Sequence, residues 1–118
     1  PAEFNGLMGI AELSIAGLDV GVDGLVSGPA NAYPGPVSEM YDAHAAGDRE
    51  RAVELNNDAN IPIVNAIRDP PTAAALKYLL AETGRDVGPP LLPLSELDAD
   101  QCAVLEACAD DLSDYPSA

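Results

Sequence analysis

Apolar side chains recur at helical spacing over residues 7–20, which predicts an amphipathic helix there. The short apolar run 23–27 is closed by a Gly-Pro pair, a pattern typical of a buried parallel strand. Residues 2–5 form a short extended stub in front of the helix. Together these segments predict one strand–helix–strand unit at the N-terminus.

After this unit the strand pattern disappears and the chain becomes helical. Asp48 suits the N-cap of a long helix, and Pro62 is expected to kink or divide that helix. Ser95, followed three residues later by Asp98, resembles a capping box for a last helix, and residues 113–118 are expected to fray. Four helices are predicted, over residues 36–46, 48–67, 72–82 and 95–112.

The predicted strands all lie near the N-terminus, in one strand–helix–strand unit that is followed only by helices. A two-stranded parallel sheet cannot cover both of its faces or close its edges alone. The N-terminal region therefore reads as the last part of a larger α/β structure. With 118 residues the chain is too short for a complete (β/α)8 barrel, which needs about 250.

Charge changes this picture by excluding several partners. The chain carries 20 acidic and 5 basic residues, a net charge of -15, which argues against nucleic acid and anionic membranes. Small apolar residues, few aromatics and a single lysine, Lys77, are typical of proteins from salt-adapted microbes. No apolar run is long enough to span a bilayer and no signal-peptide pattern is present, so we expect a cytoplasmic protein.

Few residues are candidates for metal or redox chemistry. Cys102 and Cys108 are six residues apart in one predicted helix, on different faces, so both are interpreted as small core residues. His44, with Asp42 and Asp48 nearby, is interpreted as a surface histidine among carboxylates, its charged form favoured, rather than a metal ligand. We expect no metal and no cofactor.

Several short segments follow one another in the order and spacing of one known family. They are Phe4-Asn5-Gly6, 21–28, Ala30-Asn31 with Pro34, 39–43 with 46–48, 75–77 with Gly84, and 91–94. Together they resemble the closing part of the dihydrodipicolinate synthase and N-acetylneuraminate lyase family of class I aldolases, which use pyruvate. The resemblance implies that 1–47 is the last βαβα part of a TIM barrel and 48–118 its C-terminal helical extension.

The resemblance also implies which chemistry this chain lacks. Residues 2–5 would be barrel strand seven and 23–27 strand eight, so strands one to six are absent. In this family the lysine that forms a Schiff base with pyruvate lies on strand six. Lys77 would lie in the helical extension as a structural, solvated residue. The resemblance therefore predicts no catalytic residue in this chain, and no activity of the chain alone.

Four residues are predicted to contact substrate, because barrel enzymes build their sites at the carboxyl ends of the strands. Gly6 would follow strand seven and let the substrate approach the backbone. Val26 would lie near the Schiff-base lysine, and Ser27 or Gly28 would face the outer substrate pocket. The alternative interpretation is that Gly6 and Gly28 are ordinary turn glycines.

The sequence departs from the family at one place. Leu7 and Met8 stand where members often carry acidic residues, which weakens a sialic-acid type and leaves dihydrodipicolinate synthase and 2-keto-3-deoxygluconate aldolase types open. The implied partners are pyruvate, the missing barrel segment or a second chain that supplies it, and further copies in a homo-oligomer. A free-standing acidic helical module that binds a partner is the alternative hypothesis.

Overall fold

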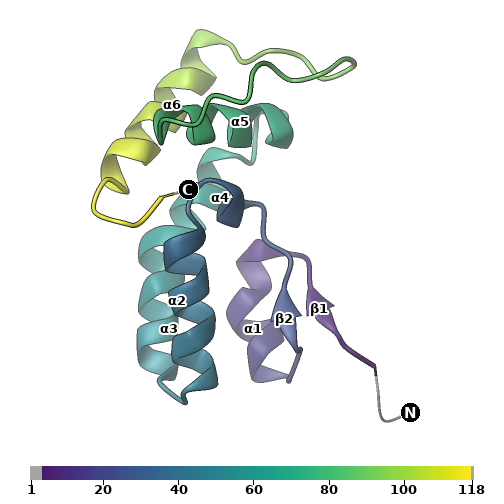
Figure 1. Cartoon of the computed structure of the whole chain (residues 1–118), viewed down its shortest axis with the longest axis vertical. Helices are drawn as coiled ribbons and strands as arrows, with labels where there is room; N and C mark the ends of the chain where they lie inside the picture. Colours follow the sequence, from purple (N-terminus) through teal and green to yellow (C-terminus); the bar gives the residue numbers. More distant parts are fainter. Residues whose placement is uncertain (1–3, 118) are drawn as a thin grey trace.

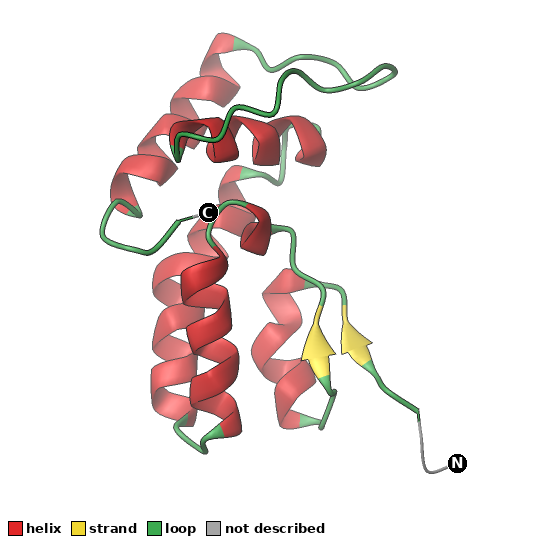
Figure 2. Cartoon of the chain, in the orientation of Figure 1, coloured by secondary structure: helices red, strands yellow, loops and turns green. Residues whose placement is uncertain are grey.

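The structure is a set of packed helices with one small parallel sheet at the N-terminal end (Figures 1 and 2). The computed structural model describes residues 4–117. In chain order the elements are β1 (Leu7–Met8), α1 (Ser14–Asp19), β2 (Gly24–Leu25), α2 (Pro34–Ala45), α3 (Arg49–Leu55), α4 (Ile61–Ala66), α5 (Thr72–Glu82) and α6 (Ala99–Asp111), with short 3-10 turns at Ala11–Leu13 and Pro29–Asn31.

β1 and β2 lie side by side and parallel, with Met8 opposite Leu25. The predicted strand–helix–strand unit is therefore confirmed, but the first strand and the start of the helix were predicted wrongly. Residues 2 and 3 lie outside the described part, 4–5 form no strand, and the strand occupies Leu7–Met8, where a helix was expected. The extended backbone there lets Met8 cover Gly17 of α1, whose missing Cβ would lie 2.8 Å from the Met8 Cε.

α2 and α3 form an antiparallel hairpin around Gly47 (Figure 1). Gly47 has a φ of 83°, a left-handed conformation that glycine adopts without strain. Asp48 caps α3 as predicted, because its side chain accepts a hydrogen bond from the Arg51 amide. α2 begins at Pro34, two residues earlier than expected, since proline tolerates the first helical turn.

The predicted long helix over 48–67 is divided, as expected from Pro62. Between α3 and α4 the chain forms a π-helical turn, Asn56–Asn60, in which the Ile61 amide donates to the Asn56 carbonyl. Pro62 has no amide proton and its ring crowds the preceding turn, so a regular α-helical ladder cannot continue through it. The wider π turn accommodates this interruption.

The helix over 72–82 is confirmed as α5, but the last helix begins later than predicted. Its N-cap is Asp98 rather than Ser95, and Asp98 and Gln101 exchange hydrogen bonds in a capping box. Leu97 is half-buried against the core. We infer that α6 begins only after this residue because Leu97 first has to reach the core. The helix start predicted at Ser95 is therefore wrong.

Two clusters of buried apolar side chains hold the helices together. One lies between α4, α5 and α6; the other lies between α2 and α3, across the predicted boundary at residue 47. Tyr115 packs against both clusters, and Pro116 lies so close to Gly35 that a Cβ there would approach it to 2.7 Å. The tail after α6 therefore returns to the start of α2 (Figure 1), and the predicted fraying is wrong for Tyr115 and Pro116.

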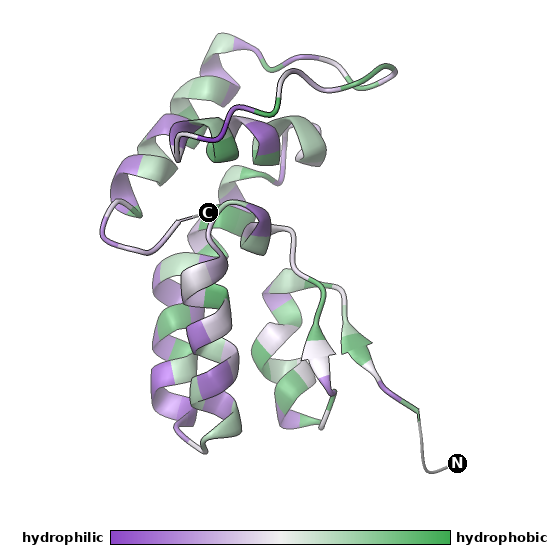
Figure 3. Cartoon of the chain, in the orientation of Figure 1, coloured by the Kyte–Doolittle hydropathy of each residue, from purple (hydrophilic) through white to green (hydrophobic). Residues whose placement is uncertain are grey.

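The sheet is left uncovered on one side. β1 is apolar along its length (green in Figure 3), and Leu7 is 60% exposed. Phe4 and Val26, which flank the strands, are 82% and 60% exposed. Parallel sheets are normally buried on both faces, so this surface lacks the cover that its composition requires.

Three polar side chains connect α1 to the α2–α3 hairpin. Asp19, the last residue of α1, accepts hydrogen bonds from Arg49 at 2.7 Å and from His44 at 3.0 Å. The hydrogen bonds from Arg49, and then from His44, lower the pKa of Asp19 from 3.8 to about 2. The charged carboxylate is thus favoured by the folded state.

This pKa predicts an acid-dependent contribution to stability. A carboxyl with a lowered folded-state pKa stabilises the fold above its unfolded pKa, and this contribution is lost as the pH falls from about 4 to about 2. Asp19→Asn should therefore lower the free energy of unfolding at neutral pH. The difference between this variant and the unsubstituted chain should become smaller at low pH. Urea unfolding at several pH values measures this, with Asp42→Asn, an exposed carboxyl without an ion pair among the described residues, as control. An equal deficit at all pH values would contradict it.

Candidate functional site at the strand ends

The carboxyl ends of β1 and β2 lie next to each other because the strands are parallel. The Val26 amide donates to the Met8 carbonyl at 2.9 Å, so the two chains stay paired up to this point. Beyond it, Gly9 and Ile10 follow β1, and 26–28 follows β2. Barrel enzymes use this end of the strands for binding and catalysis.

Three of the four predicted site residues lie together here. Val26 is largely exposed, and Ser27 and Gly28 are half-buried. The Ser27 Oγ is buried but has no hydrogen-bond partner among residues 4–117. A buried hydroxyl usually finds a partner, so the unpaired Ser27 Oγ is an exception at the strand ends.

Gly6 lies at the opposite end of the sheet. It precedes β1, and its carbonyl accepts a hydrogen bond from the Asp23 amide at 2.8 Å. Its own amide donates to the Asp23 Oδ2 at 2.7 Å. The structure therefore does not bring Gly6 together with 26–28, because β1 occupies residues after this glycine rather than before it.

A pocket of about 220 Å³ opens at the strand ends. It collects residues from the turns after β1 and β2, from the end of α4, and from the first residue of α5. They are Ala11, Glu12, Gly28, Pro29, Val64, Ile67, Arg68 and Thr72.

Sequence reasoning found only Gly28 of this set. Arg68 could have been noticed as one of five basic residues in a very acidic chain, directly before the break at Pro70-Pro71.

Arg68 brings a positive charge to this pocket. Its Nη2 lies 3.5 Å from the Glu12 Oε1 and 3.5 Å from the Asn65 Oδ1. The pocket thus joins the strand ends to the C-terminal helices through an ion pair between residues 56 positions apart.

A model of a known protein family matches almost the whole chain. The model described as "Dihydrodipicolinate synthetase family" matches residues 2–111. The chain belongs to the dihydrodipicolinate synthetase family. The resemblance seen in the sequence is confirmed.

Known members of the dihydrodipicolinate synthetase family are similar over almost the whole chain. An uncharacterized DapA-like lyase of Halobacterium salinarum is 41% identical over 93% of this chain and 36% of its own length. A 4-hydroxy-tetrahydrodipicolinate synthase of Listeria welshimeri is 34% identical over 96% of this chain and 38% of its own. A solved structure from T. tenax, named KD(P)GA, is 34% identical over 92% of this chain and 37% of its own, with a TM-score of 0.75. The chain thus spans little more than a third of these relatives.

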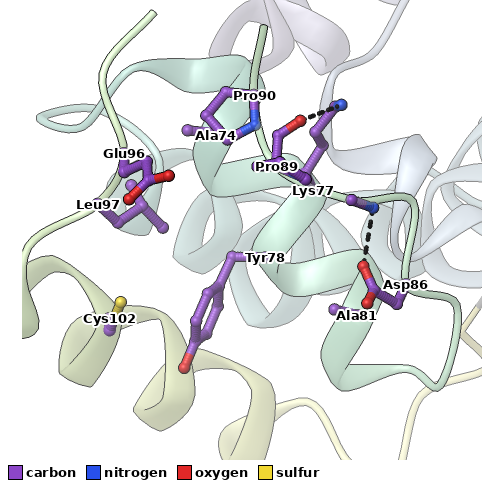
Figure 4. Close-up of a pocket in the computed structure, with 11 residues that line it drawn as sticks. Ala74, Lys77, Tyr78, Ala81, Asp86, Pro89, Pro90, Glu96, Leu97 and Cys102 are labelled. Atoms are coloured by element: carbon purple, nitrogen blue, oxygen red, sulfur yellow. Dashed lines mark hydrogen bonds between the residues drawn. The ribbon is translucent and has the colours of Figure 1, made fainter.

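Lys77 lies in the middle of α5 and does not line the pocket at the strand ends. Its Nζ donates to the Pro89 carbonyl at 2.8 Å and so holds the loop between α5 and α6 (Figure 4). The neighbouring Tyr78 hydroxyl donates to Glu106 at 2.7 Å, which raises the pKa of Tyr78. These contacts border a second hollow of about 270 Å³ and support a structural interpretation of the lysine in this family member.

The other candidate side chains do not line the pocket at the strand ends. Both cysteines are free thiols; Cys108 is buried, which raises its pKa to about 11, and Cys102 is half-buried. His44 is held by Asp19 rather than by Asp42 or Asp48. Among residues 4–117 no three His, Cys, Asp or Glu side chains gather as metal ligands. None of the helices in this part of the chain is long and apolar enough to cross a membrane.

Proposed function

We propose that this chain is the closing part of a pyruvate-dependent class I aldolase. Residues 1–47 would form the last βαβα part of a (β/α)8 barrel, and 48–118 its C-terminal helical extension. The observation that carries this proposal is the uncovered sheet, whose exposed Leu7, Phe4 and Val26 need a covering layer. The length of the relatives supports it, since this chain spans 36% to 38% of theirs.

In the assembled enzyme this chain would supply part of the pocket wall rather than the nucleophile. A class I aldolase joins a lysine amine to the ketone carbon of pyruvate and releases water, which gives a Schiff base. The one lysine of this chain, Lys77, is hydrogen-bonded to the Pro89 carbonyl and does not line the pocket at the strand ends. The amine would therefore come from the remaining strands, while Val26, Ser27 and Gly28 would line the site.

The substrate class follows from the same comparison. The Listeria welshimeri relative is a 4-hydroxy-tetrahydrodipicolinate synthase and the T. tenax structure is named KD(P)GA, so we keep synthase and sugar-acid aldolase types as candidates. Both types would use a 2-oxo acid. The acidic composition and the Halobacterium salinarum relative support an enzyme that works in strong salt. We propose further that the enzyme is cytoplasmic and forms a homo-oligomer.

A chimera tests the proposal. Residues 2–111 would replace the matching part of the Halobacterium salinarum relative, and the product would be treated with pyruvate and borohydride in molar KCl. Borohydride reduces a Schiff base to a stable amine, so mass spectrometry locates the reacting lysine. We expect a pyruvyl adduct on the relative's part of the chimera and none on this chain alone.

The unmodified relative serves as the positive control. An adduct on Lys77 would contradict the proposal that the reacting lysine lies outside this chain. A chimera that folds but traps no pyruvate, although the relative does, would contradict the aldolase proposal itself. Cooperative unfolding of the isolated chain as a monomer in dilute buffer would favour the free-standing acidic module instead.

A further inference from the structure

Arg68 is held more loosely than the other paired arginines. Arg49 and Arg51 each approach a carboxylate oxygen to 2.7 Å. Both contacts of Arg68 are 3.5 Å long, and its side chain is 58% exposed. Its ion pair with Glu12 is therefore weak and can be exchanged for another anion at little cost.

The guanidinium also has unused hydrogen-bonding capacity. An arginine carries five N–H donors in a planar fork that matches the oxygens of a carboxylate or phosphate. Both contacts of Arg68 within residues 4–117 use Nη2, which leaves Nη1 and Nε available. Arg68 lines the pocket at the strand ends, and Thr72, a residue with a hydroxyl group, lines it as well.

Because the chain is strongly acidic, an anionic ligand needs direct contact with a cationic side chain such as Arg68 in order to bind. With a net charge of -15, the protein as a whole repels anions. Strong salt screens this repulsion beyond a few ångströms but does not replace a direct contact. A pocket of about 220 Å³ holds one small group, not a whole large ligand.

We propose that this pocket binds the anionic end of the aldehyde substrate, a carboxylate or a phosphate, through Arg68. In the empty pocket Glu12 pairs with the Arg68 guanidinium, and this ion pair breaks when the anion binds. This inference rests on the proposed aldolase function, because it places the reacting end of the substrate at the strand ends. It makes Arg68 a specificity-determining residue supplied by the helical extension.

Kinetics of the chimera with three aldehydes test this. Glyceraldehyde is neutral, glyceraldehyde 3-phosphate carries a phosphate, and succinic semialdehyde carries a carboxylate. Arg68→Gln should raise KM for an anionic aldehyde about tenfold, with kcat and the neutral aldehyde unchanged. Whichever anion is affected identifies the ligand. Arg85→Gln, a change of an exposed arginine outside the pocket, should have no effect.

Equal changes for neutral and anionic aldehydes, or no change at all, would overturn the inference. Pyruvate trapping by the same chimera is independent of Arg68, so its loss would instead refute the proposed function. A second measurement needs no activity: NMR titration of the chimera with inorganic phosphate and with succinate. We expect shifts of the Glu12, Gly28 and Thr72 amides that Arg68→Gln abolishes; shifts that survive the substitution, or none, would overturn the inference.

Discussion

Replacing Leu105 by alanine is expected to lower the free energy of unfolding by about 2–5 kcal/mol. Leu105 lies on α6 and is fully buried in the cluster that joins α4, α5 and α6. Truncation removes apolar contacts and leaves a cavity that these three helices cannot close completely. Small domains have about 5–15 kcal/mol of total stability, so a large part of it would be lost.

The neighbouring residue provides a matched control. Val104 precedes Leu105 on the same helix but is 54% exposed. Val104→Ala should change stability by about 0.5 kcal/mol or less. Urea unfolding in molar KCl, followed by circular dichroism, measures both variants. Similar losses for the two would show that α6 does not pack as the structure describes.

Asn60→Ala is expected to cost about 1–3 kcal/mol. Asn60 is 2% exposed in the π-helical turn, and its Nδ2 donates to the Ala11 carbonyl at 2.9 Å and to the Asn56 Oδ1 at 3.0 Å. The substitution leaves Asn56 in a buried place without this donor. It also releases the turn after β1, which borders the pocket at the strand ends.

Asn57 offers the control for this change. It belongs to the same π-helical turn but is exposed. Asn57→Ala should be close to neutral in urea unfolding. For Asn60→Ala, hydrogen exchange should also become faster at the backbone amides around Ala11, which a loss confined to the helices would not produce. Unchanged exchange there would contradict the role given to Asn60.

Much of the helical part could be predicted because its signals are local. Asp48 at an N-cap, Gly47 and Gly84 at helix ends, and Pro62 within a helix act on their own neighbours in the chain. The failures have the opposite origin. β1 lies at Leu7–Met8 because Met8 packs on Gly17, and α6 waits for Asp98 because Leu97 first reaches the core.

The candidate site was only partly predictable for the same reason. Val26, Ser27 and Gly28 follow from the rule that sites lie at the carboxyl ends of parallel strands. Arg68 and Glu12 meet across 56 positions, and no spacing in the sequence indicates such a contact. Gly6 was misplaced because its position depended on where the strand begins.

The sequence by itself determined the order of the elements, the family likeness and the charge, since these depend on local patterns and composition. Only the tertiary structure decided which strand end each residue occupies, that Lys77 holds a loop, and that Arg68 reaches the pocket. Side-chain packing between distant segments sets these positions. A shift of a few residues in one short strand moves a residue from one end of the sheet to the other, as happened for Gly6.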